Sequence, residues 1–511
     1  MTRPNILLIQ TDNHTAAMNG FMGDRIVQTR NLDALAARSV QFNLAVCATP
    51  ICTPSRMCLI TGRQPHNCAG WSNHWVLFPE HRTWPQHFAD HGYTTCQVGK
   101  MHFGGADQMH GFQFRPYGDL KHGLGHQPEP LSSFPGYDHV QSAGVTEIPE
   151  SLIQDNVITR EALAFALEHE DAQPEKPWFM YVSYTRPHPP LRSPGRYLRH
   201  YRDKVPYTVH DASHYATLSS FDQWLTDQNG YARLTADEIK AGREAYYANI
   251  DFVDDCIGEL IRGLEHAGAI DNTIVIFLSD HGEMAGAHGI WHTGKFYDES
   301  ILTALLMSGP GIRAGHHEVN APISHLDIFP TCCRLCDLPV PDGVEGFDVS
   351  PVLAHPGHSP MPREYAACEY MYWGVRVKAH AIALNTPCRA WRTVVNEQWK
   401  YVHIQGGESL LFNRADDPTE DNNVVDRPDY ADVRDELHRK LCTDFSWEQV
   451  VAQYQEDLVR IDQYASGVKP TTPNQYTLQD GRTFDAEGEL YGARWLAVPN
   501  VTGGIIPQQY G

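Results

Sequence analysis

The chain has 511 residues, and its 62 acidic and 40 basic side chains give a formal net charge of −22 with histidine neutral. With 42% hydrophobic and 20% charged residues, the composition is that of a globular protein, and the length predicts at least two domains. The acidic balance argues against a nucleic-acid or anionic-membrane partner, because no basic field exists to collect phosphates. A small anionic substrate is still compatible, since a few local cations and one metal ion can reverse the sign inside a pocket.

An apolar segment near the start of the sequence and the cysteine content bear on the cellular compartment. The apolar run at residues 5–10 is too short for a secretory or membrane-spanning segment, so we expect a cytoplasmic protein with no membrane partner. The twelve cysteines are too sparse for a disulfide scaffold, and we expect free, packed thiols. Cys332, Cys333 and Cys336 are clustered, which is compatible with packing on a helix or with a zinc site, although no second Cys or His pair lies at zinc spacing.

Aliphatic runs alternate with helical patterns along the first 310 residues. The predicted strands are residues 5–11, 94–99, 178–184, 273–279 and 304–308. The predicted helices include residues 31–37, with Asn31 at the N-cap, 157–168 and 241–267. This alternation predicts an α/β fold with a mostly parallel sheet flanked by helices, whose ligands gather beyond the carboxyl ends of the strands.

Polar residues follow four of these strands directly. Asp12, Lys100, the run 186–188 and the pair Asp280-His281 each come just after a predicted strand. Because the carboxyl ends of parallel strands meet at one edge of a sheet, we expect a ligand site there.

The sequence changes in character after about residue 362. Residues 393–404 read as a hairpin with its turn near Asn396-Glu397, 409–412 as a further strand and 430–443 as an amphipathic helix. We therefore expect a larger domain over residues 1–375, a smaller C-terminal α+β domain with a short antiparallel sheet over 376–450, and a polar segment over 451–511. That last segment is a disordered tail or an arm around a neighbouring subunit; its aromatic residues favour the arm and hence a homo-oligomer.

Five short segments carry residues suited to ester hydrolysis. In chain order they are Asp12-Asn13, Cys52-Thr53-Pro54-Ser55-Arg56, Gly99-Lys100-Met101-His102, Pro187-His188-Pro189 and Ser279-Asp280-His281-Gly282-Glu283. A bare Cys-x-Pro-x-Arg occurs by chance in many proteins, but all five in this order resemble the type I sulfatases of the alkaline phosphatase superfamily. The resemblance runs from residue 5 to about 310 and resumes weakly at 391–423. It implies an alkaline-phosphatase-like α/β fold and hydrolysis of a sulfate ester.

The segments also contain the ligands of a divalent cation. Asp12, Asp280 and the side-chain carbonyl of Asn13 are hard oxygen donors that suit Ca²⁺, Mg²⁺ or Mn²⁺, and His281 as a ligand favours Mn²⁺ or another ion that accepts imidazole. Such a cation binds the ester oxygens and stabilises negative charge in the transition state. The resemblance implies one divalent ion, with the modified side chain of Cys52 as a further ligand.

Five other side chains are expected to act on the ester. Arg56, Lys100 and Lys295 supply fixed donors to its remaining oxygens. His188 protonates the departing alkoxide or phenoxide, and His102 takes a proton from the nucleophile.

The resemblance also implies that Cys52 is oxidised to formylglycine by a formylglycine-generating enzyme, which recognises the spacing to Pro54 and Arg56. The aldehyde is hydrated to a geminal diol; one hydroxyl attacks the ester, and loss of the proton on the other, to His102, expels the inorganic anion. The alternative is that Cys52 stays a nucleophilic thiol. A thiolate is a poor match for a metal that prefers oxygen ligands.

The sequence departs from the family pattern at several positions. Many members have an acid in place of Asn13 and asparagine in place of His281; the Asp-His form is found in certain sulfatases and in phosphonate monoester hydrolases. A lysine is usual near Thr293, whereas this chain offers Lys295 two residues later. Asn73 resembles a residue that contacts a substrate oxygen.

The sequence is therefore compatible with three functions. The first is a sulfuric ester hydrolase, or sulfatase, that acts on a small sulfate monoester, and the alternative is a phosphonate monoester hydrolase or phosphodiesterase that uses the same site. The third, a non-catalytic relative, is disfavoured by the intact set of acids, histidines and cations. Trp71 and Trp75 lie near the cysteine motif and either line the site or belong to the core.

Overall fold

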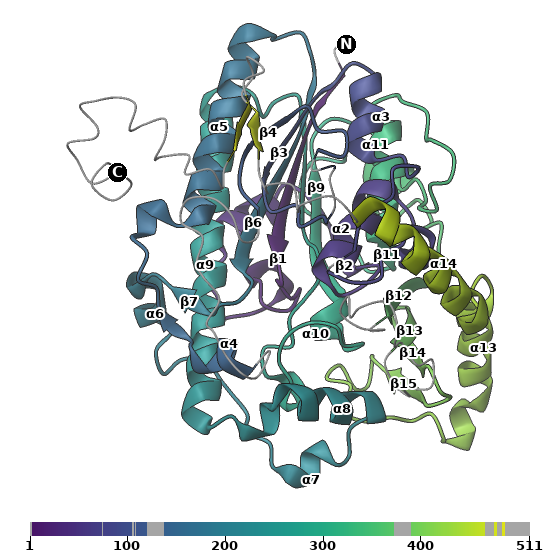
Figure 1. Cartoon of the computed structure of the whole chain (residues 1–511). Helices are drawn as coiled ribbons and strands as arrows, with labels where there is room; N and C mark the ends of the chain where they lie inside the picture. Colours follow the sequence, from purple (N-terminus) through teal and green to yellow (C-terminus); the bar gives the residue numbers. More distant parts are fainter. Residues whose placement is uncertain are drawn as a thin grey trace.

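A nine-stranded sheet lies at the centre of the residues that the computed structural model describes, which are 3–73, 75–104, 107, 109–119, 137–371, 390–465, 475–477 and 483–485. The strand order is β10-β2-β9-β8-β1-β6-β3-β4, with β11 paired to β2 (Figure 1). The strands are β1 (Asn5–Asp12), β2 (Val40–Val46), β3 (Thr94–Gly99), β4 (Phe114–Tyr117), β6 (Trp178–Pro187), β8 (Thr273–Ser279), β9 (Leu302–Ser308), β10 (His317–Val319) and β11 (Ile323–Ser324).

The pairing confirms a mostly parallel sheet. β1 lies between β6 and β8 and is parallel to both, and β3 is parallel to β6 and β4. β9 is antiparallel to its neighbours β8 and β2. The five strands expected from the sequence are all present as β1, β3, β6, β8 and β9, and four of them, in the order β8-β1-β6-β3, end at the same edge of the sheet.

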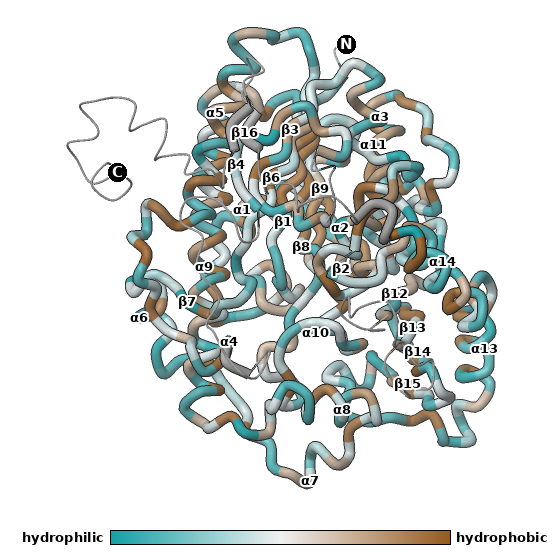
Figure 2. The backbone as a smooth tube through the Cα atoms, in the orientation of Figure 1, coloured by the Kyte–Doolittle hydropathy of each residue, from teal (hydrophilic) through white to brown (hydrophobic). Residues whose placement is uncertain are grey.

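Alternating side chains of the strands build two cores, one on each face of the sheet. Leu7 and Ile9 of β1 pack with α1, α5 and α9, whereas Ile6 and Leu8 pack with α2, α3 and α11. Figure 2 shows the central strands as hydrophobic beneath more polar helices. The helices over the two faces are α1 (Arg30–Ala36), α5 (Gln154–Ala172), α9 (Ala236–His266), α2 (Cys52–Thr61), α3 (Trp84–Asp90) and α11 (Ile328–Leu335).

The expected helices are confirmed, but one N-cap is wrong. α1 begins after Thr29, so Asn31 lies inside the helix. The Asn31 side chain donates to Asp254 Oδ2 of α9 at 2.8 Å, a tertiary contact that replaces the expected cap. The remaining helices and small strands are α4 (Tyr137–Gln141), β5 (Gly144–Val145), β7 (Arg192–Ser193), α6 (Gly195–Tyr201), α7 (Ala212–Tyr215), α8 (Ser220–Asn229), α10 (Asp298–Ile301) and α12 (Ser350–Ala354).

A second, four-stranded antiparallel sheet follows, in the order β12-β13-β14-β15. Its strands are β12 (Ala366–Met371), β13 (Ala390–Val395), β14 (Trp399–Ile404) and β15 (Ser409–Asn413), and the helices α13 (Ala431–Cys442) and α14 (Trp447–Ala465) come after it. The expected hairpin is confirmed, with its turn closed by a hydrogen bond from Asn396 N to Trp399 O of 3.0 Å. The domain boundary expected at 375/376 lies outside the described residues, and β12 precedes it.

Helix α14 packs back onto the segment after the cysteine motif. Trp71 Nε1 donates to Asp457 Oδ2 at 2.9 Å, and the rings of Trp71 and Trp75 lie 5.5 and 5.6 Å from that of Tyr454. Both tryptophans are buried, so they belong to the core. Beyond α14 the structure describes only β16 (Gln475–Thr477) and β17 (Thr483–Asp485); the rest of the proposed arm lies outside the described residues.

The cysteines of the described residues are free thiols. Cys332, Cys333 and Cys336 are buried on or directly after α11, which agrees with helix packing, and they belong to none of the metal-ligating groups found in the described part of the chain. No helix within the described ranges combines the length and apolarity that a membrane crossing requires.

Candidate functional site

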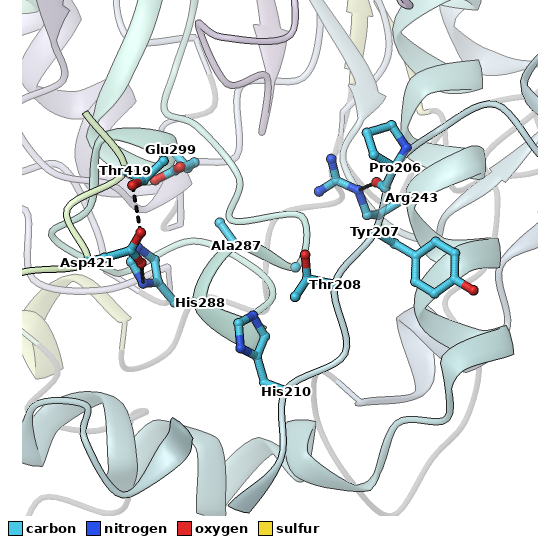
Figure 3. A pocket seen from close by; sticks show the side chains of 11 residues that line it. Pro206, Tyr207, Thr208, His210, Arg243, Ala287, His288, Glu299, Thr419 and Asp421 are labelled. Carbon is cyan, nitrogen blue, oxygen red and sulfur yellow. Dashed lines mark hydrogen bonds and ion pairs between the residues drawn. The ribbon is translucent and has the colours of Figure 1, made fainter. Parts of the chain in front are cut away.

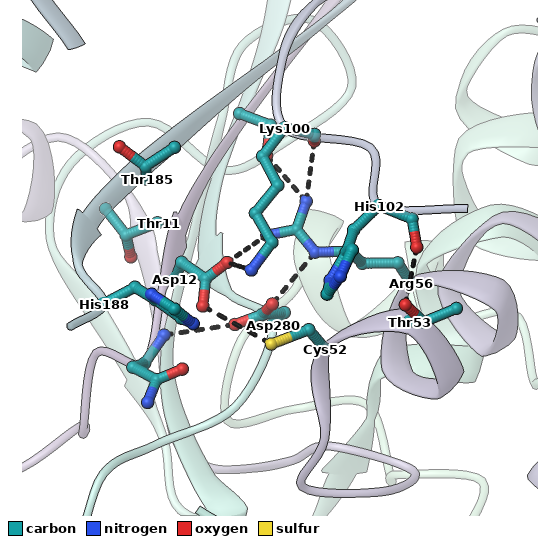
Figure 4. Close-up of polar contacts among 12 residues, drawn as sticks. Thr11, Asp12, Cys52, Thr53, Arg56, Lys100, His102, Thr185, His188 and Asp280 are labelled. Atoms are coloured by element: carbon teal, nitrogen blue, oxygen red, sulfur yellow. Dashed lines mark hydrogen bonds and ion pairs between the residues drawn. The ribbon is translucent and has the colours of Figure 1, made fainter. Parts of the chain in front are cut away.

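The carboxyl ends of β1, β3, β6 and β8 and the start of α2 bring a group of buried polar side chains together (Figure 4). Asp12 ends β1, Asp280 follows β8, and Cys52 is the first residue of α2. The ligand atoms of Asp12, Cys52, Asp280 and His281 all lie within 4.8 Å of one another, and all four residues are buried. Two predicted carboxylates, the predicted imidazole and the cysteine are therefore brought together, as expected from the sequence.

The N-terminus of α2 places Cys52 in this cluster. Ile51 is extended, with φ −152° and ψ 137°, and the helix begins at Cys52. Pro54 lies in the first turn, where its missing N–H costs no hydrogen bond. The side-chain oxygen of Asn73 accepts from Thr53 N at 2.9 Å, which satisfies one free donor of the helix end. Cys52 thus faces the cluster from the positive end of a helix dipole, and Asn73 is held beside it.

Arg56 lies behind the two carboxylates and joins them. Its Nε donates to Asp280 Oδ2 and its Nη2 to Asp12 Oδ2, each at 2.9 Å, and both ion pairs are fully buried. Nη1 donates to Lys100 O at 2.8 Å and to Ser183 Oγ at 2.7 Å. Because these bonds turn the guanidinium toward the carboxylates, Arg56 holds both acids in place, which differs from the direct donation to the ester expected from the sequence.

Lys100 reaches the cluster from the end of β3. Its ammonium forms an ion pair with Asp12 Oδ2. Gly99, at φ +95°, allows the close approach to β6, since a Cβ there would lie 2.0 Å from Ser183 O. Burial favours the neutral form of Asp12, but the charges of Lys100, His188 and Arg56 outweigh it and hold the pKa of Asp12 far below its ordinary value. The carboxyl of Asp12 is therefore ionised, as a cation ligand would need to be.

His281 is oriented by the backbone. Its Nδ1 lies 3.0 Å from Gly282 O, which can only accept, so this nitrogen carries a proton and Nε2 faces Cys52 Sγ at 3.3 Å. Burial opposes protonation of His281, but Asp280, Cys52 and Asp12 outweigh it and raise its pKa to about 10. Surroundings that attract a proton so strongly also attract a cation, which would displace it.

The environment of the Asn13 side chain shows whether a cation fits among these residues. The residue has φ 56°, a left-handed conformation that asparagine tolerates better than most residues. Its Nδ2 donates to Glu283 Oε2 at 2.8 Å, whereas its buried Oδ1 has no hydrogen-bond partner. The backbone N–H of Asn13 donates to Asp280 Oδ1 at 3.2 Å, so the residue adjoins the cluster, and an unsatisfied buried carbonyl oxygen there is suited to a hard divalent cation. The donor set therefore fits the predicted metal.

The two predicted proton-transfer residues flank Cys52, as Figure 4 shows. Nδ1 of His188 lies 2.5 Å from Pro189 O, so this nitrogen carries a proton. Burial and then the charge of Lys100 lower the pKa of His188 well below its ordinary value, so Nε2 has to take up a proton before it can protonate a leaving group. His102 has φ 62°, its N–H donates to Asp119 Oδ1 at 2.9 Å, and its buried Nδ1 has no partner. Burial and then the charge of Lys100 lower the pKa of His102 to about 3, so its imidazole is neutral and able to accept a proton.

Lys295 is the predicted residue that this arrangement does not bring to the cluster. Its Nζ donates to Trp291 O and Thr293 O, both at 2.7 Å. Burial lowers its pKa to about 8, against the opposing charges of Glu283 and Asp222. A contact between Lys295 and the ester oxygens is therefore not supported by these bonds.

Two residues that support the site were not singled out from the sequence. Ser183, on β6, accepts from Arg56, and nothing in its sequence context indicated this role. Glu283, which accepts from Asn13, lies within the Ser-Asp-His-Gly-Glu segment, but the segment alone indicates no function for it.

A separate hollow of about 460 Å³ lies outside this cluster (Figure 3). It shares no residue with the cluster and is lined by side chains of both charge signs, among them Arg243, Glu299, His288 and Asp421.

The comparisons with known proteins agree with the geometry. The sulfatase family model matches residues 4–338, more than half of the chain. The chain belongs to the sulfatase family. A second model, the C-terminal region of N-sulphoglucosamine sulphohydrolase, matches residues 286–445 of this sulfatase.

Relatives of similar length support the assignment. This sulfatase is 29% identical to the choline-sulfatase of Rhizobium meliloti over 83% of each chain, and 30% identical to the ulvan-active sulfatase of Formosa agariphila over 86% of this chain and 80% of the relative. Among solved structures, it is similar to the phosphonate monoester hydrolase of Agrobacterium radiobacter, with a TM-score of 0.72, 24% identity, and coverage of 94% and 99% of the two chains. It is also similar to a protein solved with its substrate D-glucosamine-2-N,6-O-disulfate. The TM-score is 0.69 and the identity 21%, with coverage of 89% of this chain and 99% of that protein.

These likenesses confirm an alkaline-phosphatase-like fold and a sulfuric ester hydrolase. The solved structures are below 25% identity, so they establish the fold and not the substrate.

Proposed function

We propose that this sulfatase hydrolyses a small sulfate monoester with a formylglycine derived from Cys52 and one divalent cation. The observation that carries the proposal is the convergence of Cys52 with Asp12, Asp280 and His281 within 4.8 Å. The nearby orphan oxygen of Asn13 completes a ligand set for the cation. Ca²⁺ and Mn²⁺ suit this set best, and Mg²⁺ is compatible.

The chemistry that these groups supply is Lewis-acid stabilisation of the ester oxygens and a hydroxyl nucleophile at position 52. The chain's own residues bind and orient around them. Lys100 brings positive charge to the anion, and the amide N–H₂ of Asn73 is the predicted contact to a further oxygen. Arg56 keeps the carboxylates of Asp12 and Asp280 in position. His102 accepts the proton from the nucleophile, and His188 Nε2 faces the leaving oxygen.

The partners follow from this proposal. A formylglycine-generating enzyme has to act on Cys52, and it has to do so before folding is complete, because the folded side chain is buried. The buried free thiols of the described residues fit a reducing compartment, which supports a cytoplasmic protein. We also propose a homo-oligomer formed through the C-terminal segment, which light scattering after size exclusion tests.

The alcohol half of the substrate is proposed only as a small group. One of the relatives reported above is named for choline and the other for ulvan, so their names do not agree on this half. Among the described residues of the site, the contacts do not distinguish a phosphonate ester from a sulfate ester; the match to the sulfatase family model favours the sulfate.

The direct test is turnover of nitrophenyl sulfate and nitrophenyl phenylphosphonate by protein produced together with its converting enzyme. We expect faster turnover of the sulfate, an aldehyde at residue 52 by peptide mass spectrometry, and loss of activity on chelation that added Mn²⁺ or Ca²⁺ reverses. Faster phosphonate turnover would replace the substrate assignment, and activity without the aldehyde would exclude the formylglycine.

His188→Ala is expected to slow hydrolysis of esters with poor leaving groups by about 10² to 10⁴-fold, the usual contribution of general acid catalysis. A nitrophenyl ester, whose leaving group needs little protonation, should lose much less. The measurement is kcat across a series of aryl sulfates of rising leaving-group pKa. Equal losses over the series would remove His188 from the acid role.

A further inference from the structure

A buried carboxylate lies directly behind the asparagine of the proposed cation site. Glu283 and Asn13 are each 2% exposed. Glu283 Oε2 accepts from Asn13 Nδ2 at 2.8 Å, and its Oε1 accepts from the backbone N–H groups of Ala285, at 3.2 Å, and His292. Both oxygens of this carboxylate are therefore engaged, one by two backbone donors and the other by residue 13.

This arrangement determines how the amide of Asn13 is turned. A carboxylate only accepts hydrogen bonds, so the N–H₂ end of the amide faces Glu283. The carbonyl end is left buried without a hydrogen-bond partner, while the backbone N–H of the same residue donates to Asp280 Oδ1 at 3.2 Å. The oxygen that remains is the atom a cation needs, and an N–H₂ group in its place would repel the cation.

We propose that Glu283 is a positioning residue that turns the oxygen of Asn13 toward the cation, and that this contact is the reason the chain has an amide at position 13. The inference rests on the proposed cation site and gives Glu283 a role in it. An acid at position 13 would place two buried carboxylates in contact, which is unfavourable. An amide gives the cation an oxygen and gives Glu283 a donor.

Isosteric substitutions reverse the polarity of this contact. In Glu283→Gln, the N–H groups of Ala285 and His292 hold the new amide oxygen, so the new N–H₂ group faces Asn13 and forces its amide to flip. In Asn13→Asp, two carboxylates meet. The double substitution Asn13→Asp with Glu283→Gln restores a donor opposite an acceptor and leaves an oxygen for the cation.

The test is a titration of the metal-free, full-length protein with Mn²⁺ alone, by calorimetry and by electron paramagnetic resonance of the free ion. Each single variant should bind Mn²⁺ about 10 to 100-fold more weakly, the usual cost of losing a group that orients a metal ligand. The double variant should bind at least as tightly as the original protein. Asp222→Asn is the matched control, because it removes another buried carboxylate of this region without contacting Asn13, and its affinity should stay within about threefold.

The outcomes separate the inference from the proposed function. Suppose that the original protein binds Mn²⁺ and that the affinity of the double variant falls by the product of the two single-variant losses. Glu283 then does not orient Asn13, although the cation site itself is supported. If the original protein binds neither Mn²⁺ nor Ca²⁺, the cation site itself is wrong and the inference falls with it. Melting temperatures measured with a chelator present show whether each variant folds. Recovery of Mn²⁺ affinity in the double variant is a second control, because a general loss of structure could not produce it.

Discussion

Asp280→Asn is expected to lose cation uptake and turnover together, with kcat/KM lower by at least about a thousandfold. One oxygen of Asp280 belongs to the ligand cluster and the other accepts from Arg56 Nε at 2.9 Å, so the substitution removes a ligand charge and half of the charge that balances a buried guanidinium. Lewis-acid stabilisation is worth several kcal/mol, and each 1.4 kcal/mol corresponds to about tenfold in rate. Calorimetric titration with Mn²⁺ and assays of aryl sulfate hydrolysis measure the two losses.

The control for this prediction is Asp254→Asn. Asp254 is a buried carboxylate on α9 that accepts from Asn31 and Leu32, away from the cluster. Its loss should lower stability and leave cation affinity and kcat/KM within about threefold. If Asp280→Asn loses turnover but binds Mn²⁺ normally, Asp280 is not a ligand of the cation that acts in catalysis.

The sequence predicts the centre of the fold because its central strands are apolar on both faces. β1 and β8 are continuous aliphatic runs that pack into both cores, so their positions could be read without tertiary information. The sequence does not predict β2, because Gln41 and Asn43 interrupt its apolar pattern. Gln41 Nε2 donates to Asn43 Oδ1 at 2.6 Å and Asn43 donates to Glu318 and Asn320, contacts that only the folded chain provides.

In the C-terminal part, too, contacts distant in sequence determine elements that the local sequence does not predict. α14 begins at Trp447, before the polar segment expected from residue 451, and its buried side chains are few. Tyr454 and Asp457 anchor it to Trp71, almost four hundred residues earlier in the chain. No local pattern could indicate that contact, whereas the hairpin around Asn396 was predictable because its turn is closed by the local backbone.

In the site, the sequence predicts which residues meet but not which way each one points. Asp12, Cys52 and Asp280 converge because strand ends and a helix start share one edge of the sheet. The direction of Arg56 depends on two buried carboxylates that attract it more strongly than an exposed ligand position would. Lys295 lies in a loop, and its ammonium donates to the backbone carbonyls of Trp291 and Thr293 in the same loop. Residue spacing does not reveal these contacts.

Cys52→Ala, in protein produced with the converting enzyme, is expected to reduce kcat for sulfate esters by about 10⁴ to 10⁶-fold, the scale seen when a covalent nucleophile is removed. The remaining donors still bind an anion, so inorganic sulfate should inhibit binding of a substrate analogue as before. Cys52 is buried at the first position of α2, where alanine fits without a clash, so the melting temperature should change little. Activity assays, competition of inorganic sulfate with a bound substrate analogue, and thermal unfolding measure the three expectations.

Cys58→Ala is the matched control because Cys58 lies in the same helix, is equally buried and contacts Cys68 Sγ at 3.8 Å away from the carboxylates. It should keep both the aldehyde at residue 52 and turnover. Cys52→Ser separates the remaining alternatives, because a hydroxyl introduced there can attack the ester once but has no second hydroxyl to release the anion. A single turnover followed by a stable covalent ester would support the diol, whereas sustained turnover by Cys52→Ser, or full activity of an unmodified Cys52, would show that the aldehyde is not the nucleophile's source.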